Sequence, residues 1–306
     1  MRAVGLVTEY NPFHNGHLHH LRESLRVTGA EASVAVMSGH FLQRGEPAMV
    51  DKWVRTEMAL AAGIDLVFEL PFAFACNSAP HFAMGAVQTL DALGVVDSLC
   101  FGSEAGDLAQ LNKVATVLVE RQEEIESLTA TRLRDGVNYP VARSEVLVGL
   151  LPEVPAEILK SPNNILGIEY LKALYSTNSR IQPYTIKRLG AGYHDTDVKS
   201  EIASATGMRR MIAAGEEVES LLPQPCRKVL DEALRAGRSL DTVRLFVALQ
   251  SQMLQESETL NEIYLVDDGI DRRLELAALK AASFDELVSG IKSRQWTLTR
   301  VQRILM

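Results

Sequence analysis

Cysteine is scarce in this 306-residue chain, and the few cysteines form no metal or redox motif. Cys76, Cys100 and Cys226 make no C-x-x-C pair, and none lies at zinc-ligand spacing from other cysteines or histidines. The pattern therefore excludes a disulfide framework and a zinc ribbon. It predicts a reducing compartment, in which each thiol packs as a small apolar side chain.

Long apolar runs are also missing. The most apolar stretch, residues 64–75, contains Asp65, Glu69 and Pro71, so it does not span a bilayer. The apolar run at the N-terminus is too short for a signal peptide and ends at Glu9. We therefore expect a cytoplasmic protein with no membrane partner, and no protein partner is evident.

An excess of positive charge is absent as well. The formal net charge is −8, which disfavours indiscriminate nucleic-acid binding over the whole surface. A local basic face remains compatible with this balance. Four cations with no acid among them occur near the end of the chain: Lys292, Arg294, Arg300 and Arg303.

The first hundred residues alternate between short apolar runs and amphipathic segments. The expected strands cover residues 2–8, 33–37, 64–70 and 98–101, and the expected helices cover residues 16–27, 51–62 and 78–93. This rhythm predicts an α/β fold, a doubly wound parallel sheet with right-handed crossovers. Ligands of such sheets bind beyond the carboxyl ends of the strands, here after the first, second and fourth strands.

The remainder of the chain is mostly helical in pattern, apart from one β-branched segment at residues 181–189. We expect a catalytic domain over residues 1–205 and a helical region over residues 206–306, with a soft boundary near 195–215. The last segment, residues 297–306, has the pattern of an amphipathic helix without a cap or polar tail. Either this helix docks on the body, or the chain is a shortened version of a longer one.

The first expected strand leads into a loop with phosphate-binding chemistry. Gly16 allows close backbone approach, and the following helix N-terminus offers free N–H groups to an anion. His14 and His17 flank this glycine and can stabilise charge on a phosphoryl oxygen. The ordinary alternative is a histidine-rich capping or metal loop that also uses His19 and His20.

A second phosphate element is expected much later in the chain. Ser204 and Thr206 precede a helix, and Arg209 follows them at the spacing of one helical turn. Hydroxyls and a bidentate guanidinium suit the β- and γ-phosphates of a nucleotide. Taken alone, the segment is also consistent with an ordinary helix cap beside solvated arginines.

Together these two elements resemble the HIGH superfamily of nucleotidyltransferases, with its Rossmann-like fold. Six strings, found in order, resemble one family within it, the bacterial tRNA(Met) cytidine acetate ligases: VTEYNPFHNGHLHH, MSGHFLQRGEPAMVDKWVR, FGSEAGD, SPNNILGIEYLKAL, IKRLGAGYHD and IASATGMRR. The likeness covers roughly residues 1–215 and continues more loosely to the end of the chain.

The resemblance implies a set of site residues. The catalytic residues it implies are His14, His17, Lys187, Arg188 and Arg209. The nucleotide contacts it implies are Val7, Thr8, Glu9, Tyr10, Asn11, Pro12, Phe13, Asn15, Gly16, His20, Gly102, Ser103, Asn163, Asn164, Ser204 and Thr206. It implies no metal held by protein side chains.

The resemblance also implies an activity. Members activate acetate with ATP, with Mg²⁺ as the expected counter-ion, and form acetyl-adenylate and pyrophosphate. They then pass the acetyl group to N4 of the wobble cytidine in elongator tRNA(Met). The helical half with its basic tail would hold the anticodon arm. Members of the family are longer than this chain, so the resemblance implies the tRNA step less strongly than adenylate formation.

Several alternatives stay open. On the loop after the second strand, Gln43 and Arg44 suit a small carboxylate or a tRNA phosphate, whereas Lys52 and Arg55 either face the site or belong to a solvated helix face. The chain is alternatively a HIGH-superfamily adenylyltransferase for another small substrate, or a non-catalytic nucleotide-responsive RNA-binding protein. A metal-dependent hydrolase would lack a matching carboxylate set.

Overall fold

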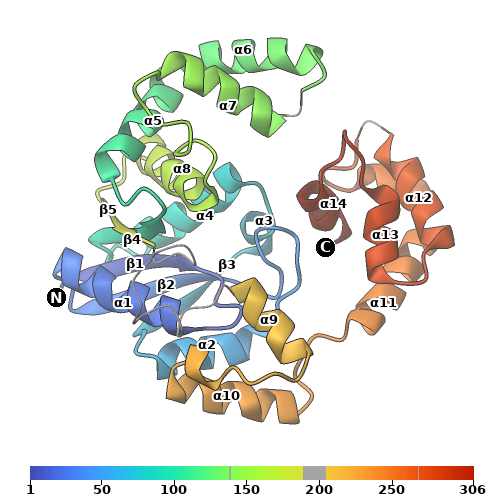
Figure 1. Ribbon diagram of the computed structural model, residues 1–306, viewed down its shortest axis with the longest axis horizontal. Coiled ribbons are helices and arrows are strands. Elements are labelled where there is room, and N and C mark those ends of the chain that lie inside the picture. Colours follow the sequence, from blue (N-terminus) through green and yellow to red (C-terminus); the bar gives the residue numbers. More distant parts are fainter. Residues whose placement is uncertain (138, 189–204, 268) are drawn as a thin grey trace.

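A five-stranded parallel sheet forms the centre of the molecule, seen in a computed structural model that describes all residues except 138, 189–204 and 268 (Figure 1). The strand order is β3-β2-β1-β4-β5, and every pairing is parallel. The strands are β1 (Ala3–Thr8), β2 (Ala32–Ser38), β3 (Leu66–Leu70), β4 (Ser98–Ser103) and β5 (Gln182–Lys187). The predicted doubly wound sheet is thus confirmed.

The central strands are apolar on both faces because helices cover both. Residues of β1 and β2 are buried on alternate sides, and their register runs from Ala3 opposite Ala32 to Thr8 opposite Met37. Such strands read as continuous apolar runs rather than as alternating patterns. The helices that follow the first strands are α1 (Asn15–Thr28), α2 (Lys52–Ala61), the short α3 (Phe72–Ala75) and α4 (Ala79–Ala92).

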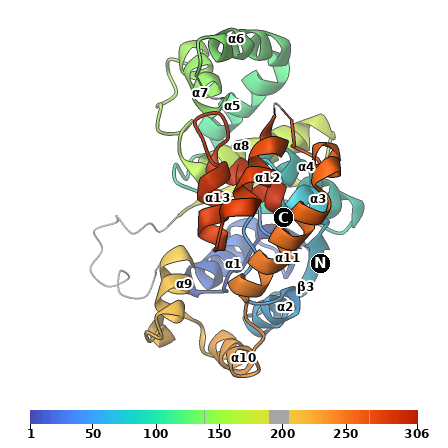
Figure 2. The same cartoon turned by 90° about the vertical axis from the view of Figure 1, so that its right-hand side faces the viewer.

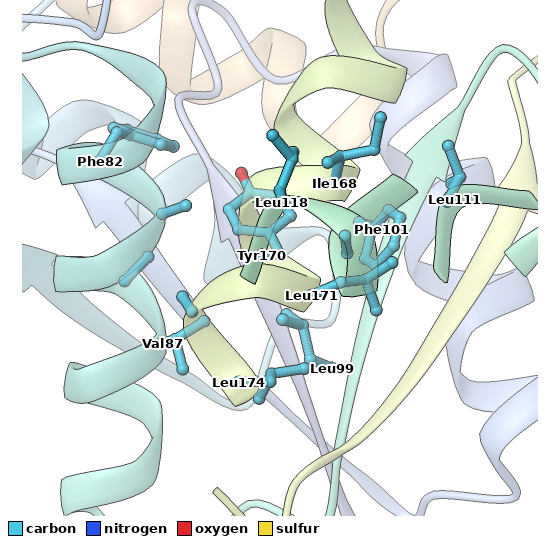
Figure 3. Packing of buried hydrophobic residues seen from close by; sticks show 14 of the residues in the cluster. Phe82, Val87, Leu99, Phe101, Leu111, Leu118, Ile168, Tyr170, Leu171 and Leu174 are labelled. Carbon is cyan, nitrogen blue, oxygen red and sulfur yellow. The ribbon is translucent and has the colours of Figure 1, made fainter. Parts of the chain in front are cut away.

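One face of the sheet is covered by α4, α5 (Leu108–Glu120) and α8 (Pro162–Ser176). Figure 3 shows side chains of these helices packed on Leu99 and Phe101 of β4. The helix α8 lies directly on the Phe101 ring, because a Cβ added at Gly167 would stand 2.5 Å from its Cε2 atom. Two further helices, α6 (Gln122–Arg134) and α7 (Tyr139–Leu150), extend this side of the molecule.

The other face is covered by α1 and α2 together with two helices from late in the chain. These are α9 (Ala205–Ala213) and α10 (Gln224–Arg235), joined through the short 3₁₀ turn η1 (Glu219–Leu221). Met208 and Leu230 are buried in the same apolar cluster as Leu6 and Met58. The Asp51 carboxylate accepts a hydrogen bond from Val54 N, so the predicted N-cap of α2 is confirmed.

The last helices lie together on one side of the molecule (Figure 2). Their buried side chains form an apolar cluster of their own. They are α11 (Thr242–Gln255), η2 (Ser257–Glu262), α12 (Ile270–Lys280), α13 (Phe284–Ile291) and α14 (Leu298–Leu305). The predicted final helix docks on the body, where Arg303 Nε donates to Gln43 O at 2.8 Å. The division at 205/206 stays a prediction, since the residues preceding it lie outside the described part.

Among the described residues, no helix is both long enough and apolar enough to cross a membrane.

A buried arginine ties the carboxyl ends of the sheet together. The side chain of Arg55 on α2 is fully buried, and its Nη1 donates to Glu9 O at 2.6 Å and to Ser38 O at 3.0 Å. The same guanidinium donates to Gly39 O and to Val50 O. Burial lowers the pKa of Arg55 to about 10, which still leaves it charged near neutral pH. Arg55 is therefore a structural residue and not part of a solvated helix face.

We expect Arg55→Met to reduce the free energy of unfolding by about 3 kcal/mol or more, because several buried carbonyls would lose their donor at once. Denaturant unfolding followed by circular dichroism measures this change. The control is Arg26→Met, which removes an exposed guanidinium bonded, among the described residues, to Glu23 of the same helix, and it should leave the midpoint unchanged. Equal midpoints for the two variants would contradict the role given to Arg55.

Candidate active site

The candidate site lies where the strand order reverses, beyond the carboxyl ends of β1 and β4. The strand β1 pairs with β2 on one side and with β4 on the other. The connections after β1 and β4 therefore leave toward opposite faces of the sheet, which is where ligands of open α/β sheets bind. The loop with residues 9–14 and the loop with residues 104–107 lie at this point, at the edge of the sheet that the sequence pattern indicated.

The two histidines predicted to be catalytic meet at the start of α1. His14 is the N-cap of this helix and is 8% exposed, and its ring stacks on that of His17 with centroids 3.7 Å apart. His17 Nδ1 accepts a hydrogen bond from His14 N at 3.3 Å, which orients the second ring. Gly16 lies between them in the first helical turn, where the backbone N–H groups point out of the helix.

Burial and neighbouring positive charge keep these imidazoles neutral. Burial lowers the pKa of His14 to about 4, and the guanidinium of Arg188 adds to this effect. His20 behaves in the same way, with a pKa of about 4. The pKa of His17 also falls well below its usual value, through burial and the two neighbouring histidines. Each neutral ring therefore has one N–H donor and one lone pair, and the lone pair on His17 Nδ1 already accepts from His14 N.

Beneath the histidines, the loop is packed by its own aromatic residues. Tyr10 and Phe13 are buried with ring centroids 4.6 Å apart, and both rings contact His17. Asn11 is buried, and its Oδ1 accepts from Met49 N at 2.8 Å. Pro12 is buried as well. These residues pack against the histidines and hold the loop in place.

Arg209 brings the second phosphate element to the first. Its Nη1 donates to Asn11 O at 3.0 Å, and its Nη2 lies 3.2 Å from Thr206 Oγ1. Nη2 also pairs with Glu46 at 3.5 Å. Thr206 and Arg209 thus lie beside the loop of residues 9–14, called the histidine loop below, as the sequence predicts. Ser204, the third member of that element, lies outside the described residues.

Gly102 and Arg188 lie against each other at the carboxyl end of β4. A Cβ at Gly102 would stand 3.0 Å from Arg188 Cγ, so glycine lets the arginine cross the end of β4. Arg188 N donates to Ser103 O at 2.9 Å, which continues the pairing of β4 with β5 by one residue. Lys187 ends β5 and packs closely on Gly106, where an added Cβ would approach Lys187 Cβ to 2.7 Å.

Glu104 is a site residue that sequence reasoning missed. Its carboxylate accepts from Asn163 Nδ2 at 2.6 Å and from Asn164 N at 2.8 Å, so it caps α8. Asn164 Oδ1 in turn accepts from Ala105 N at 3.0 Å. The two asparagines therefore hold the loop after β4. An acid 59 residues before its partner carries no local signal, and only the fold brings the two together.

Other predicted contact residues have structural roles in the described structure. Ser103 is buried, and its hydroxyl bonds Thr185 Oγ1 at 2.7 Å and accepts from Gly106 N. Asn15 Nδ2 donates to Ser220 O at 2.8 Å. Val7 and Thr8 belong to β1 and are largely buried. Whether any of them also contacts a nucleotide stays a prediction.

Glu9 and the loop after β2 join the site to its surroundings. Glu9 Oε1 accepts from Gln43 N at 2.8 Å, and burial raises the pKa of this carboxyl. Gln43 Nε2 donates to Asn77 O, so both nitrogens of Gln43 already have acceptors within the protein and do not favour a role in holding a carboxylate. Lys52 pairs with Glu69 at 2.5 Å.

The site has features that suit a nucleoside triphosphate. Two arginines, neutral imidazole donors and a helix N-terminus lie at one edge of the sheet. His20 Nε2 is buried without a hydrogen-bond partner among the described residues. Within the described part of the chain, no three His, Cys, Asp or Glu side chains come together to hold a metal.

Comparison with known proteins agrees with this geometry. The sequence model of the HIGH Nucleotidyl Transferase family matches residues 1–306. The chain is 57% identical to the tRNA(Met) cytidine acetate ligase of Syntrophotalea carbinolica, over 100% of this chain and 73% of that protein. It is 44% identical to the protein of the same name from Alkaliphilus metalliredigens, over 100% of this chain and 76% of that protein.

A solved structure is similar over the whole chain. It is Thermotoga maritima TmcAL bound with alpha-thio ATP, which is 34% identical and superimposes with a TM-score of 0.91. The match covers 100% of this chain and 74% of that one.

We expect the protein to lose stability as the pH falls from 7 to 5. The folded pKa of about 4 for His14 and His20 lies below the unfolded value of 6.5, so the unfolded chain takes up protons first. Each of these imidazoles should cost up to about 2 kcal/mol over this range. Unfolding midpoints measured against pH test this.

His20→Gln should flatten the pH dependence, whereas the control His81→Gln, at an exposed position on α4, should not change it. An imidazole signal for residue 20 that titrates near pH 6.5 in the folded protein would show that burial does not hold this ring neutral.

Proposed function

Because the chain belongs to the tRNA(Met) cytidine acetate ligases, a family of HIGH nucleotidyl transferases, we propose that it activates acetate with ATP and acetylates N4 of the wobble cytidine in elongator tRNA(Met). The observation that carries this proposal is the stacked, neutral pair His14 and His17 at the N-terminus of α1, with Arg209 and Arg188 around it. The enzyme is an ATP-dependent ligase. We also propose that the enzyme is cytoplasmic, in line with a cysteine pattern that predicts a reducing compartment.

In the first half-reaction, an acetate oxygen attacks the α-phosphorus of ATP. A P–O bond forms to give acetyl-adenylate, and the bond to the β-phosphate breaks and releases pyrophosphate. His14 and His17 donate hydrogen bonds where charge grows on the α-phosphoryl oxygens. The dipole of α1, whose positive end lies at Asn15, favours the same anion.

Cationic side chains offset the charge of the leaving group. Arg209 is held in place by Asn11 O and Thr206, which aims its guanidinium along the edge of the histidine loop. Arg188 and Lys187 approach from the end of β5. Mg²⁺ would accompany the triphosphate as its counter-ion. Catalysis in this scheme comes from positioning and electrostatics rather than from general acid–base chemistry.

In the second half-reaction, the N4 amino group of the cytidine attacks the acetyl carbon of the mixed anhydride. The new C–N bond forms as AMP leaves, and the amine loses one proton. The cytosine has to be presented away from its neighbours, which the single-stranded anticodon loop allows. We propose that the helical residues 206–306 hold the anticodon arm.

The basic tail of this region is smaller than its sequence predicts. Lys292 and Arg294 are exposed and suited to phosphate contacts. Arg300 instead pairs with Asp267, and Arg303 is bonded to Gln43 O. Only the first two of these four cations are therefore offered as tRNA contacts.

We expect acetate-dependent exchange of labelled pyrophosphate into ATP without tRNA, and its loss by at least about a hundredfold in His17→Ala. The matched control is His81→Ala, at an exposed histidine outside the site, which should retain exchange. Exchange that proceeds without acetate would point to another acceptor substrate. ATP binding with no exchange for any small carboxylate would contradict the tRNA-independent activation step.

A further inference from the structure

The segment between β2 and α2, residues 41–51, contacts the C-terminal helices at both of its ends. At the first end the contact is with α14. The tight turn of the segment is closed by Gly45 N donating to Leu42 O, with Gly45 at φ +76°. A Cβ at Gly45 would lie 2.3 Å from Arg303 N, so α14 rests directly on this backbone. Arg303 Nε donates to Gln43 O at 2.8 Å. The turn and the helix thus fit each other only because residue 45 has no side chain.

The other end of the same segment meets the chain between α10 and α11. Leu240 N donates to Met49 O at 2.8 Å, and Val50 forms a β-bridge with Ser239. Arg238 adds two hydrogen bonds to the Asp51 carboxylate. The helices α11 to α14, whose separate apolar cluster begins at Phe246, are therefore attached to both ends of the segment 41–51.

The inner side of the segment faces the nucleotide site. Gln43 N donates to Glu9 Oε1 at 2.8 Å, and Met49 N donates to Asn11 Oδ1 at 2.8 Å. Glu46 pairs with Arg209. Gln43 is the most direct link, because its N–H binds the loop after β1 while its carbonyl binds Arg303.

We propose that Arg303 is a positioning residue for the nucleotide site, acting through Gln43 on Glu9 and the histidine loop. The inference rests on the proposed function only in taking ATP as the ligand. Arg303 comes from a region that packs around its own core and touches the site through residues 41–51. Docking of that region and binding of ATP are then coupled, and the coupling is reciprocal. A ligand that shifts helices α11 to α14 would change the affinity for ATP through the same contacts.

The ordinary alternative is that Arg303 only stabilises the fold. The two roles differ in what they change. A structural role lowers the fraction of protein able to bind ATP, whereas a positioning role raises the dissociation constant of the protein that does bind. Isothermal titration of the full chain with ATP reports both quantities, as the stoichiometry and the Kd.

We expect Arg303→Gln to raise the Kd for ATP about fivefold or more with unchanged stoichiometry, because one well-aligned hydrogen bond to the turn is lost. Arg303→Lys keeps a donor and should recover part of the affinity. Gly45→Ala should weaken ATP binding in the same direction, since the new Cβ would push the turn and α14 apart.

The matched control is Arg300→Gln, one helical turn earlier on α14. Its guanidinium bonds Asp267 and Leu265 O inside the helical region and makes no described bond to residues 41–51. This variant should keep the Kd of the unmodified protein.

The proposal is overturned if Arg303→Gln and Gly45→Ala keep the original Kd, or if only the stoichiometry falls. Failure of the proposed function has a different signature. It would appear as ATP binding by the unmodified protein without acetate-dependent pyrophosphate exchange, and the Kd comparison would still decide the role of Arg303.

Discussion

The buried guanidinium of Arg55 is the interaction on which the carboxyl edge of the sheet depends. It donates to carbonyls of residues that end β1 and β2 and to Val50, which precedes its own helix. The carbonyls of Glu9, Gly39 and Val50 lie outside the strands, so a buried side chain with several donors is an available partner for them. With this edge held in place, the histidine loop and residues 41–51 have a common base.

On that base, the site combines neutral donors with separate positive charges. His14, His17 and His20 are kept neutral by burial and by Arg188, while Arg209 is fixed by Asn11 O. This separation suits a reaction in which the negative charge is that of the ATP phosphates and not that of a protein side chain. A charged imidazole pair at stacking distance would repel itself, whereas a neutral pair can donate to one phosphate together.

Long-range contacts complete the site and were the part that sequence reasoning did not reach. Glu104 caps α8 across 59 residues, and Arg303 reaches Gln43 across 260. No spacing, period or motif in the sequence predicts either contact. Arg55 shows the opposite error, since a position on an amphipathic helix indicated solvent or substrate and the side chain instead lies buried among carbonyls. Such roles depend on which loops converge, and convergence is a property of the folded chain.

The sequence by itself determined the parallel sheet, the strand–loop–helix setting of His14, Gly16 and His17, and the cap at Asp51, because periodicity, glycine placement and capping act over a few residues. It also predicted a second phosphate element at Thr206 and Arg209, from the hydroxyl and guanidinium groups and from the resemblance to a family. Only the tertiary structure decided that Arg209 meets Asn11, that Glu104 holds the asparagines, and that α14 rests on Gly45. These contacts join segments far apart in the chain, and their energies exist only after the sheet and its two helical layers have brought those segments together.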